Sequence, residues 1–273
     1  MLAGGAIPAA AAHAAPSSDR DGPAVTAAGP PIEAPIFLAA GGEGGEGSEG
    51  GEGGEAGVSA EEAAKDPAAF LTAIDVIAAH YLAGQAAYAE GRAQSAGEMF
   101  AHPIAEIYVD LEPVFKARGV APFQAAMEKA SALALEKAPK AEVDKAVDTV
   151  MAALKAAMDK APDDGRSKLA VQAAVTGDMI DRAARQYQAA MGDTAEEPYL
   201  DGYGFYRAAR QRADGLLPEL RKAHADAAKA VSDALAALAR AYPASLRPAA
   251  APVPPGQVLG VASQAKFAIS PVK

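Results

Sequence analysis

The feature that most constrains the fold of this chain is a high alanine content combined with a near-absence of strand signals. Alanine supplies roughly a quarter of the residues, far above average usage, and it has the highest helix propensity of any amino acid. Period-two runs of β-branched or aromatic residues do not appear. We therefore predict an all-α fold, an up-and-down helical bundle in which small side chains allow close helix packing.

Proline, glycine and helix-capping signals divide this bundle into helices. Asp66-Pro67 predicts that the first helix has Asp66 as its N-cap and Pro67 as its first residue. Gly91 predicts the end of that helix. Pro103 and Pro218 are each expected to open a new helix. The expected helices after the first are 93–101, 103–119, 121–138, 140–160, 167–191, 198–213 and 218–243.

The chain before the bundle has two parts. Residues 1–14 resemble the end of a signal peptide with an Ala12-His13-Ala14 cleavage pattern, which predicts export to the periplasm. No Lys or Arg precedes this apolar run, so an ordinary alanine-rich tail is the alternative. Residues 15–58 are rich in proline, glycine and glutamate and predict a disordered linker, because they offer little to bury.

The helical bundle is expected to span residues 59–243 and to be followed by a proline-rich tail over 244–273. The apolar stretch 258–269 in that tail either docks on the bundle or stays loose. The bundle has a weak internal sequence similarity, since Ile74-Asp75 and Tyr81 match Ile180-Asp181 and Tyr187. This similarity favours two duplicated halves within the bundle.

Composition excludes several classes of function. The chain of 273 residues has no cysteine, which removes disulfides, thiolate metal sites and a cysteine nucleophile. A formal net charge of −10 argues against nucleic-acid binding, which needs clustered Lys and Arg. No apolar run of about 18 residues lies beyond the N-terminus, so we expect no transmembrane span. No phosphate-binding loop, nucleophile elbow or zinc-protease motif is present, and we expect no enzyme.

The best candidate for chemistry lies between residues 98 and 110. Glu98, His102, Glu106 and Asp110 are spaced by four, which places them on one face of a continuous helix. Because Pro103 disfavours helix at the preceding residue, we expect His102 at an N-cap with Glu106 one turn inside. Imidazole and carboxylate groups, with Tyr108 near in sequence, suit iron, copper or zinc. The alternative is that His102 and Glu106 only stabilise a helix start.

Other polar residues are weaker candidates. His80 lies beside the apolar stripe of the first helix, and it approaches His102 if the two helices pack antiparallel across Gly91. Asp75 faces away from His80 on that helix. His224 is expected to be exposed. A further set of residues has two alternative interpretations. We expect either a second oxygen-rich site or an aromatic core stripe beside a solvated acidic helix entry. The residues of this set are Tyr199, Tyr203, Tyr206, Glu196, Glu197, Asp178 and Asp181.

These residues carry a family resemblance. An alanine-rich helical chain with the sequence His-Pro-Ile-Ala-Glu at 102–106 resembles imelysin-like periplasmic proteins, although that family's motif spaces His and Glu by three and this chain spaces them by four. The segment 199–220 resembles helical segments that accompany bacterial iron permeases. The resemblance implies a role in iron acquisition, with His102 and Glu106 as metal ligands and an envelope transport protein as partner.

Two hypotheses from different classes follow. The first is an exported metal-binding protein of iron uptake with His102 and Glu106 as ligands and Glu98, His80 and Tyr108 as helpers. The second is a non-catalytic envelope interaction module that holds no metal. Convergence of His80, His102 and Glu106 in a partly enclosed pocket favours the first hypothesis, and a surface helix cap at His102 favours the second.

Overall fold

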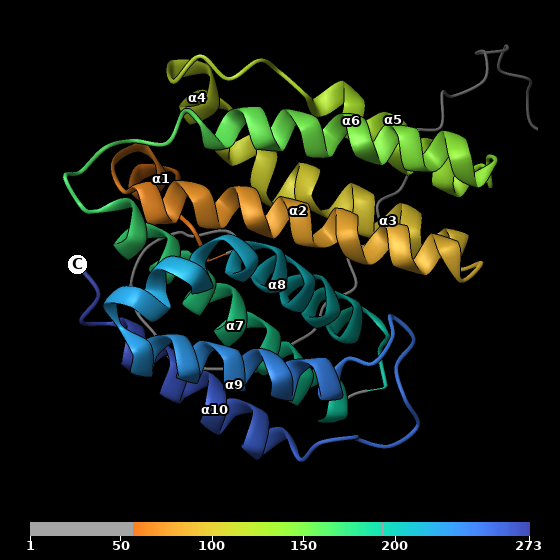
Figure 1. Ribbon diagram of the computed structural model, residues 1–273. Coiled ribbons are helices and arrows are strands. Elements are labelled where there is room, and N and C mark those ends of the chain that lie inside the picture. Colours follow the sequence, from red (N-terminus) through yellow and green to blue (C-terminus); the bar gives the residue numbers. More distant parts are fainter. Residues whose placement is uncertain (1–56, 193) are drawn as a thin grey trace, which may run out of the picture. The chain divides into compact units, whose positions relative to one another are not determined.

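The computed structural model describes residues 57–192 and 194–273, and all regular secondary structure in these residues is helical (Figure 1). The all-α prediction is therefore confirmed. The expected leader 1–14 and the linker up to residue 56 lie outside the described residues.

The helices fall into two successive groups along the chain. The first group comprises α1 (Ala60–Lys65), α2 (Pro67–Ala89), α3 (Ala93–Pro103), the π-helix η1 (Ile104–Tyr108), α4 (Val109–Ala117), α5 (Gln124–Leu135) and α6 (Lys140–Met158). The second group comprises α7 (Lys168–Gly192), α8 (Glu197–Ala223), α9 (Ala225–Ala241) and α10 (Pro255–Ile269). The predicted duplication of two halves stays a prediction.

Helix α2 is the central element of both groups. In Figure 1 it lies between α3 and α6 on one side and α7 and α8 on the other, and it contacts all four. Asp66 caps its N-terminus by accepting from the backbone N–H of Ala68 at 2.6 Å, as the Asp-Pro signal predicts. Its buried residues lie all round the helix, because neighbours cover every face.

The apolar character of α2 follows from this position. Among the described helices, α2 is long and apolar enough to cross a membrane by length and composition, with a mean hydropathy of 1.3 over its most apolar window. However, 83% of that window is buried inside the bundle. Core packing thus accounts for the apolar sequence of α2.

The sequence predicts that Pro103 and Pro218 each open a new helix, but in the structure neither does. Pro103 ends α3, and the chain continues directly into η1, where the N–H of Val109 donates to the Ile104 carbonyl five residues earlier. Pro103 has no N–H to donate to the preceding turn, and the chain stays helical past it through the wider π-turn that follows. Pro218 lies inside α8, which continues to Ala223 and has His224 as its C-cap. Packing against α7 and α9 offsets the cost of one interior proline, about 3 kcal/mol.

The C-terminal segment docks on the bundle. Helix α10 packs against α7 and α9, and it buries Val258, Ala262, Ala265 and Ile269. The second group is therefore a set of four helices that continues past the proline-rich turn after α9 (Figure 1).

Helices α2 and α8 approach each other closely at one glycine. A Cβ atom added to Gly204 would lie 2.3 Å from the carbonyl oxygen of Ala79 and 2.8 Å from its carbonyl carbon. Both atoms belong to the backbone of α2 and cannot rotate away. Only glycine therefore allows the two helices this separation.

We expect Gly204→Ala to lower the free energy of unfolding by about 2 kcal/mol or more, because the new methyl group forces the α2 backbone away. Gly215→Ala is the matched control, since this glycine lies on the same helix with nothing within 4 Å of the added carbon. It should stabilise by about 0.5–1 kcal/mol through helix propensity. Urea denaturation of both variants measures the difference, and equal midpoints would contradict the proposed contact.

Candidate metal centre

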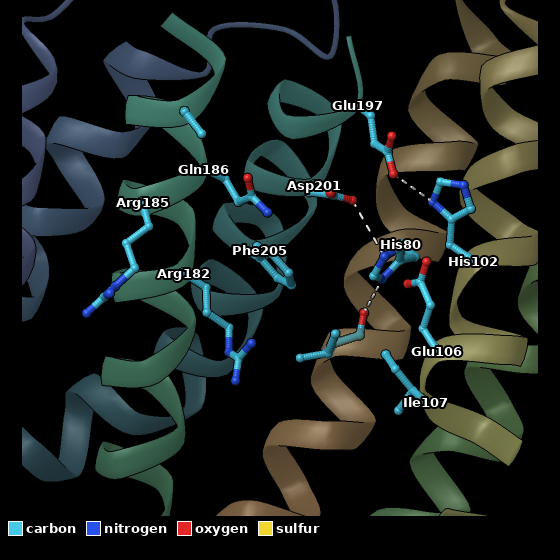
Figure 2. A pocket seen from close by; sticks show the side chains of 12 residues that line it. His80, His102, Glu106, Ile107, Arg182, Arg185, Gln186, Glu197, Asp201 and Phe205 are labelled. Carbon is cyan, nitrogen blue, oxygen red and sulfur yellow. Dashed lines mark hydrogen bonds and ion pairs between the residues drawn. The ribbon is translucent and has the colours of Figure 1, made fainter. Parts of the chain in front are cut away.

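A cavity of about 340 Å³ lies where α2, α3, η1, α7 and α8 meet (Figure 2). Its wall carries two imidazoles and three carboxylates. They are His80 from α2, His102 from α3, Glu106 from η1, and Glu197 and Asp201 from α8. Arg182, Arg185 and Gln186 of α7 line the cavity on the opposite side.

Three of the residues singled out from the sequence converge here. One ligand atom from each of His80, His102 and Glu106 lies within 4.8 Å of the other two. His102 does not cap a helix start as expected, since it lies in the last turn of α3. The helix continues into η1, so Glu106 follows one turn later on the same side, and the spacing by four keeps both side chains in the cavity.

The ring of His80 has a defined orientation. Its Nδ1 lies 2.8 Å from the carbonyl oxygen of Val76, and because a carbonyl only accepts, Nδ1 carries the hydrogen. In the neutral ring the lone pair is then on Nε2, which lies 3.5 Å from Oδ1 of Asp201 (Figure 2). A backbone carbonyl that holds one ring nitrogen while the other faces a ligand is the usual arrangement of a metal-binding histidine.

Burial holds His80 in the form that binds metals. Desolvation lowers the pKa of this imidazole below its ordinary value, against smaller opposing contributions from the Val76 carbonyl and the Glu197 charge. The ring also packs edge-on against Phe205, with centroids 6.2 Å apart. A neutral imidazole with a fixed tautomer needs no proton loss to accept a cation.

The other imidazole opens towards solvent. His102 is 27% exposed at its side chain, and its Nδ1 lies 3.4 Å from Oε1 of Glu197, which is itself 59% exposed. The two histidine rings lie 6.3 Å apart between centroids at 76°. The cavity therefore has a buried end at His80 and an accessible end at His102, through which an ion can enter.

Two expected helpers lie elsewhere. Glu98 is exposed and accepts from the Gln94 amide at 2.7 Å, away from the cavity. Tyr108 is buried on another side of the helix, where its hydroxyl accepts from the backbone N–H of Phe123 at 3.3 Å. Tyr108 packs against Phe115 and Phe123 as a core residue.

The other candidates have structural partners. Asp75 forms a buried ion pair with both Nε and a terminal nitrogen of Arg212. Asp178 and Asp181 pair with arginines one turn later on α7. Tyr199 packs against Tyr242 with centroids 5.0 Å apart. In the part of the chain that the structure describes, the second oxygen-rich site is therefore not assembled, since the metal-type group found is the one at His80.

Asp201 is the site residue that sequence reasoning misses, and Glu197 is assigned there to a different site. Both lie on α8, about a hundred residues from His102, so no local pattern joins them to it. The sequence does carry one indication that these two carboxylates act together, because Glu197 and Asp201 are spaced by four and share one face of that helix.

The fold and this site define an all-α bundle with a candidate His-His-carboxylate metal centre. Comparison with protein families adds one match: residues 162–272 are similar to the iron permease-associated 4-helix bundle domain, which is linked to iron uptake. This range contains α7 to α10 and the segment 199–220, whose resemblance to permease-associated helices is thereby confirmed. The resemblance to imelysin-like proteins is not shown. No curated protein and no solved structure matches the chain.

The match divides the site between two parts of the chain. Glu197 and Asp201 lie within the matched range, whereas His80, His102 and Glu106 precede it. The candidate centre thus joins the helices of the matched range to the helices before them.

We expect Asp75→Asn to cost about 3 kcal/mol or more of unfolding free energy, because it leaves the Arg212 charge buried without its counter-charge. Asp233→Asn, which removes a carboxylate from an exposed pair with Lys229, is the control and should leave the denaturation midpoint unchanged. A small, equal effect of both substitutions would show that the buried pair does not stabilise the bundle.

The lowered pKa of His80 predicts acid-sensitive stability in the metal-free protein. An unfolded histidine takes up a proton near pH 6.5, whereas the folded imidazole does so only at lower pH. The unfolded state then binds more protons, so the free energy of unfolding falls as the pH drops below about 7. Denaturation midpoints at pH 7 and pH 5 should differ less in His80→Gln than in the wild type. His224→Gln is the control, and an unchanged pH dependence in His80→Gln would refute the assignment.

Proposed function

We propose that this protein binds iron as cargo in its bundle and serves a permease-linked step of iron uptake. The observation that carries the proposal is the convergence of His80, His102 and Glu106 from three helical segments in one cavity. The similarity of residues 162–272 to an iron permease-associated domain supports iron as the ion.

The chemistry of the donors agrees with this cargo. Two imidazole nitrogens and a carboxylate are intermediate in softness, and they bind iron, copper and zinc. The neighbouring carboxylates of Glu197 and Asp201 add hard oxygen donors, which favour iron over copper. Iron here is the transported substrate, and binding without turnover is sufficient for the role.

The partner and the location belong to the same proposal. The permease-associated range makes an envelope transport protein the expected partner. The signal-like pattern at residues 1–14 supports a periplasmic location. A carrier there would receive iron through the exposed end of the cavity at His102.

The competing hypothesis, an interaction module without metal, requires His102 to be a surface helix cap. The position of His102 inside the cavity beside His80 and Glu197 argues against that hypothesis.

Calorimetric titration of the metal-free full chain with ferrous iron under anaerobic conditions tests the proposal, with cupric and zinc ions as comparisons. We expect His102→Ala and Glu106→Ala each to weaken iron binding at least about 10-fold, because each removes a ligand.

Two variants serve as controls for this titration. His224→Ala removes a histidine between α8 and α9, and Glu98→Gln removes a carboxylate outside the cavity, so neither should change the affinity. Iron binding that is equal in all four variants would place the ion elsewhere and overturn the proposal.

A further inference from the structure

A second cavity, of about 1020 Å³, lies at the end of the bundle where α2 and α7 begin and α6 and α8 end (Figure 1). Both helix groups contribute to its lining. Among the described residues, this cavity shares no lining residue with the metal cavity. Its volume lies at the upper end of the range that is typical of small-molecule sites, roughly 300–1,000 Å³. The cavity is therefore large enough for a ligand of its own.

Buried apolar side chains from three helices form part of its wall. Leu71 of α2, Val171 of α7 and Leu216 of α8 line the cavity and are 6%, 6% and 4% exposed. Gly215 of α8 also lines it, and a Cβ atom added to this glycine would meet nothing within 4 Å, so the wall is open there. An apolar group that enters the cavity against this wall is removed from water, which favours its binding.

A buried arginine belongs to the same lining. The side chain of Arg212 is only 8% exposed, and its Nε and Nη2 donate to the carboxylate of Asp75. Its Nη1 donates to Oε1 of Gln172 at 2.5 Å. These bonds use three of the five N–H groups of the guanidinium. In the part of the chain that the structure describes, one N–H on each terminal nitrogen therefore remains for an acceptor, and Arg212 lines the cavity in which an acceptor can lie.

The charges of the lining that have no partner sum to a positive charge. Lys155 of α6 and Lys168 of α7 form neither an ion pair nor a hydrogen bond within the described residues, and Asp159 is the one carboxylate of the lining in the same condition. The other exposed charged residues of the lining are paired or hydrogen-bonded, namely Asp163, Asp164, Arg166, Glu219 and Lys222. One positive charge is thus left over at the cavity, in a chain whose formal net charge is −10.

We propose that this cavity binds a small organic monocarboxylate with an apolar body. Its carboxylate accepts hydrogen bonds from Arg212, because a guanidinium matches a carboxylate in geometry, and its single charge balances the excess at Lys155 and Lys168. Its apolar body lies against Leu71 and Leu216. This site goes beyond the proposed iron binding, since it is a separate cavity with a separate ligand.

Calorimetric titration of the metal-free full chain with decanoate, below its micelle concentration, tests this proposal. We expect one decanoate per chain. Octanoate should bind roughly 10-fold more weakly, because it buries two fewer CH₂ groups. Decyltrimethylammonium has the same tail with a cationic head, and the acidic chain as a whole attracts it. It should nevertheless bind at least about 10-fold more weakly than decanoate, because the unpaired charge of this cavity is positive.

Two sets of variants locate the binding. Gly215→Leu fills the open wall and should abolish decanoate binding, whereas Gly260→Leu, at a glycine of α10 that also has nothing within 4 Å of an added Cβ, should not change it. The double variant Lys155→Gln/Lys168→Gln should weaken decanoate binding about 10-fold through lost charge. Lys229→Gln, on the exposed side of α9, is its control.

The outcomes separate this proposal from the iron site. No saturable decanoate binding, equal binding of the cationic probe, or binding that survives Gly215→Leu overturns the carboxylate site. None of these results bears on iron binding, because the two cavities have different lining residues and the iron titration is a separate measurement. Unchanged far-UV circular dichroism in each variant shows that the bundle remains folded.

Discussion

The close contact between α2 and α8 is the constraint on which the rest of the structure depends. Gly204 brings the backbone of α8 against the carbonyl group of Ala79. His80 is the next residue along α2, and Asp201 precedes Gly204 by about one turn of α8. The packing contact that joins the two helix groups therefore also sets the distance between His80 and Asp201. A metal centre built on such a contact is placed by the core itself and not by a mobile loop.

A second constraint acts at Pro103. An interior proline usually kinks or ends a helix, yet here the widened turn of η1 keeps the chain helical from α3 into α4. Helical continuity is what leaves Glu106 on the side of His102, and the same turn sends Tyr108 into the aromatic core with Phe115 and Phe123. The π-turn η1 thus leaves Glu106 facing the cavity and Tyr108 packed in the core.

The similarity to a permease-associated domain covers α7 to α10, and the candidate ligands lie on both sides of its boundary. The matched helices alone contribute carboxylates but neither of the two imidazoles in the cavity. The preceding helices contribute both imidazoles and one carboxylate. Retention of an ion in this cavity would depend on the packing of the two groups against each other, because both groups contribute side chains to its wall.

The sequence by itself determined the elements whose causes are local. Alanine content and the lack of period-two patterns predict the helices, Asp66 and Pro67 mark the start of α2, and the spacing of His102 and Glu106 by four predicts that they are neighbours. Only the tertiary structure decided that His80, Glu197 and Asp201 join them, that α8 continues through Pro218, and that α10 docks on α7 and α9. The physical reason is that helix signals act over one or two turns, whereas these features depend on side chains packed between segments far apart in the chain.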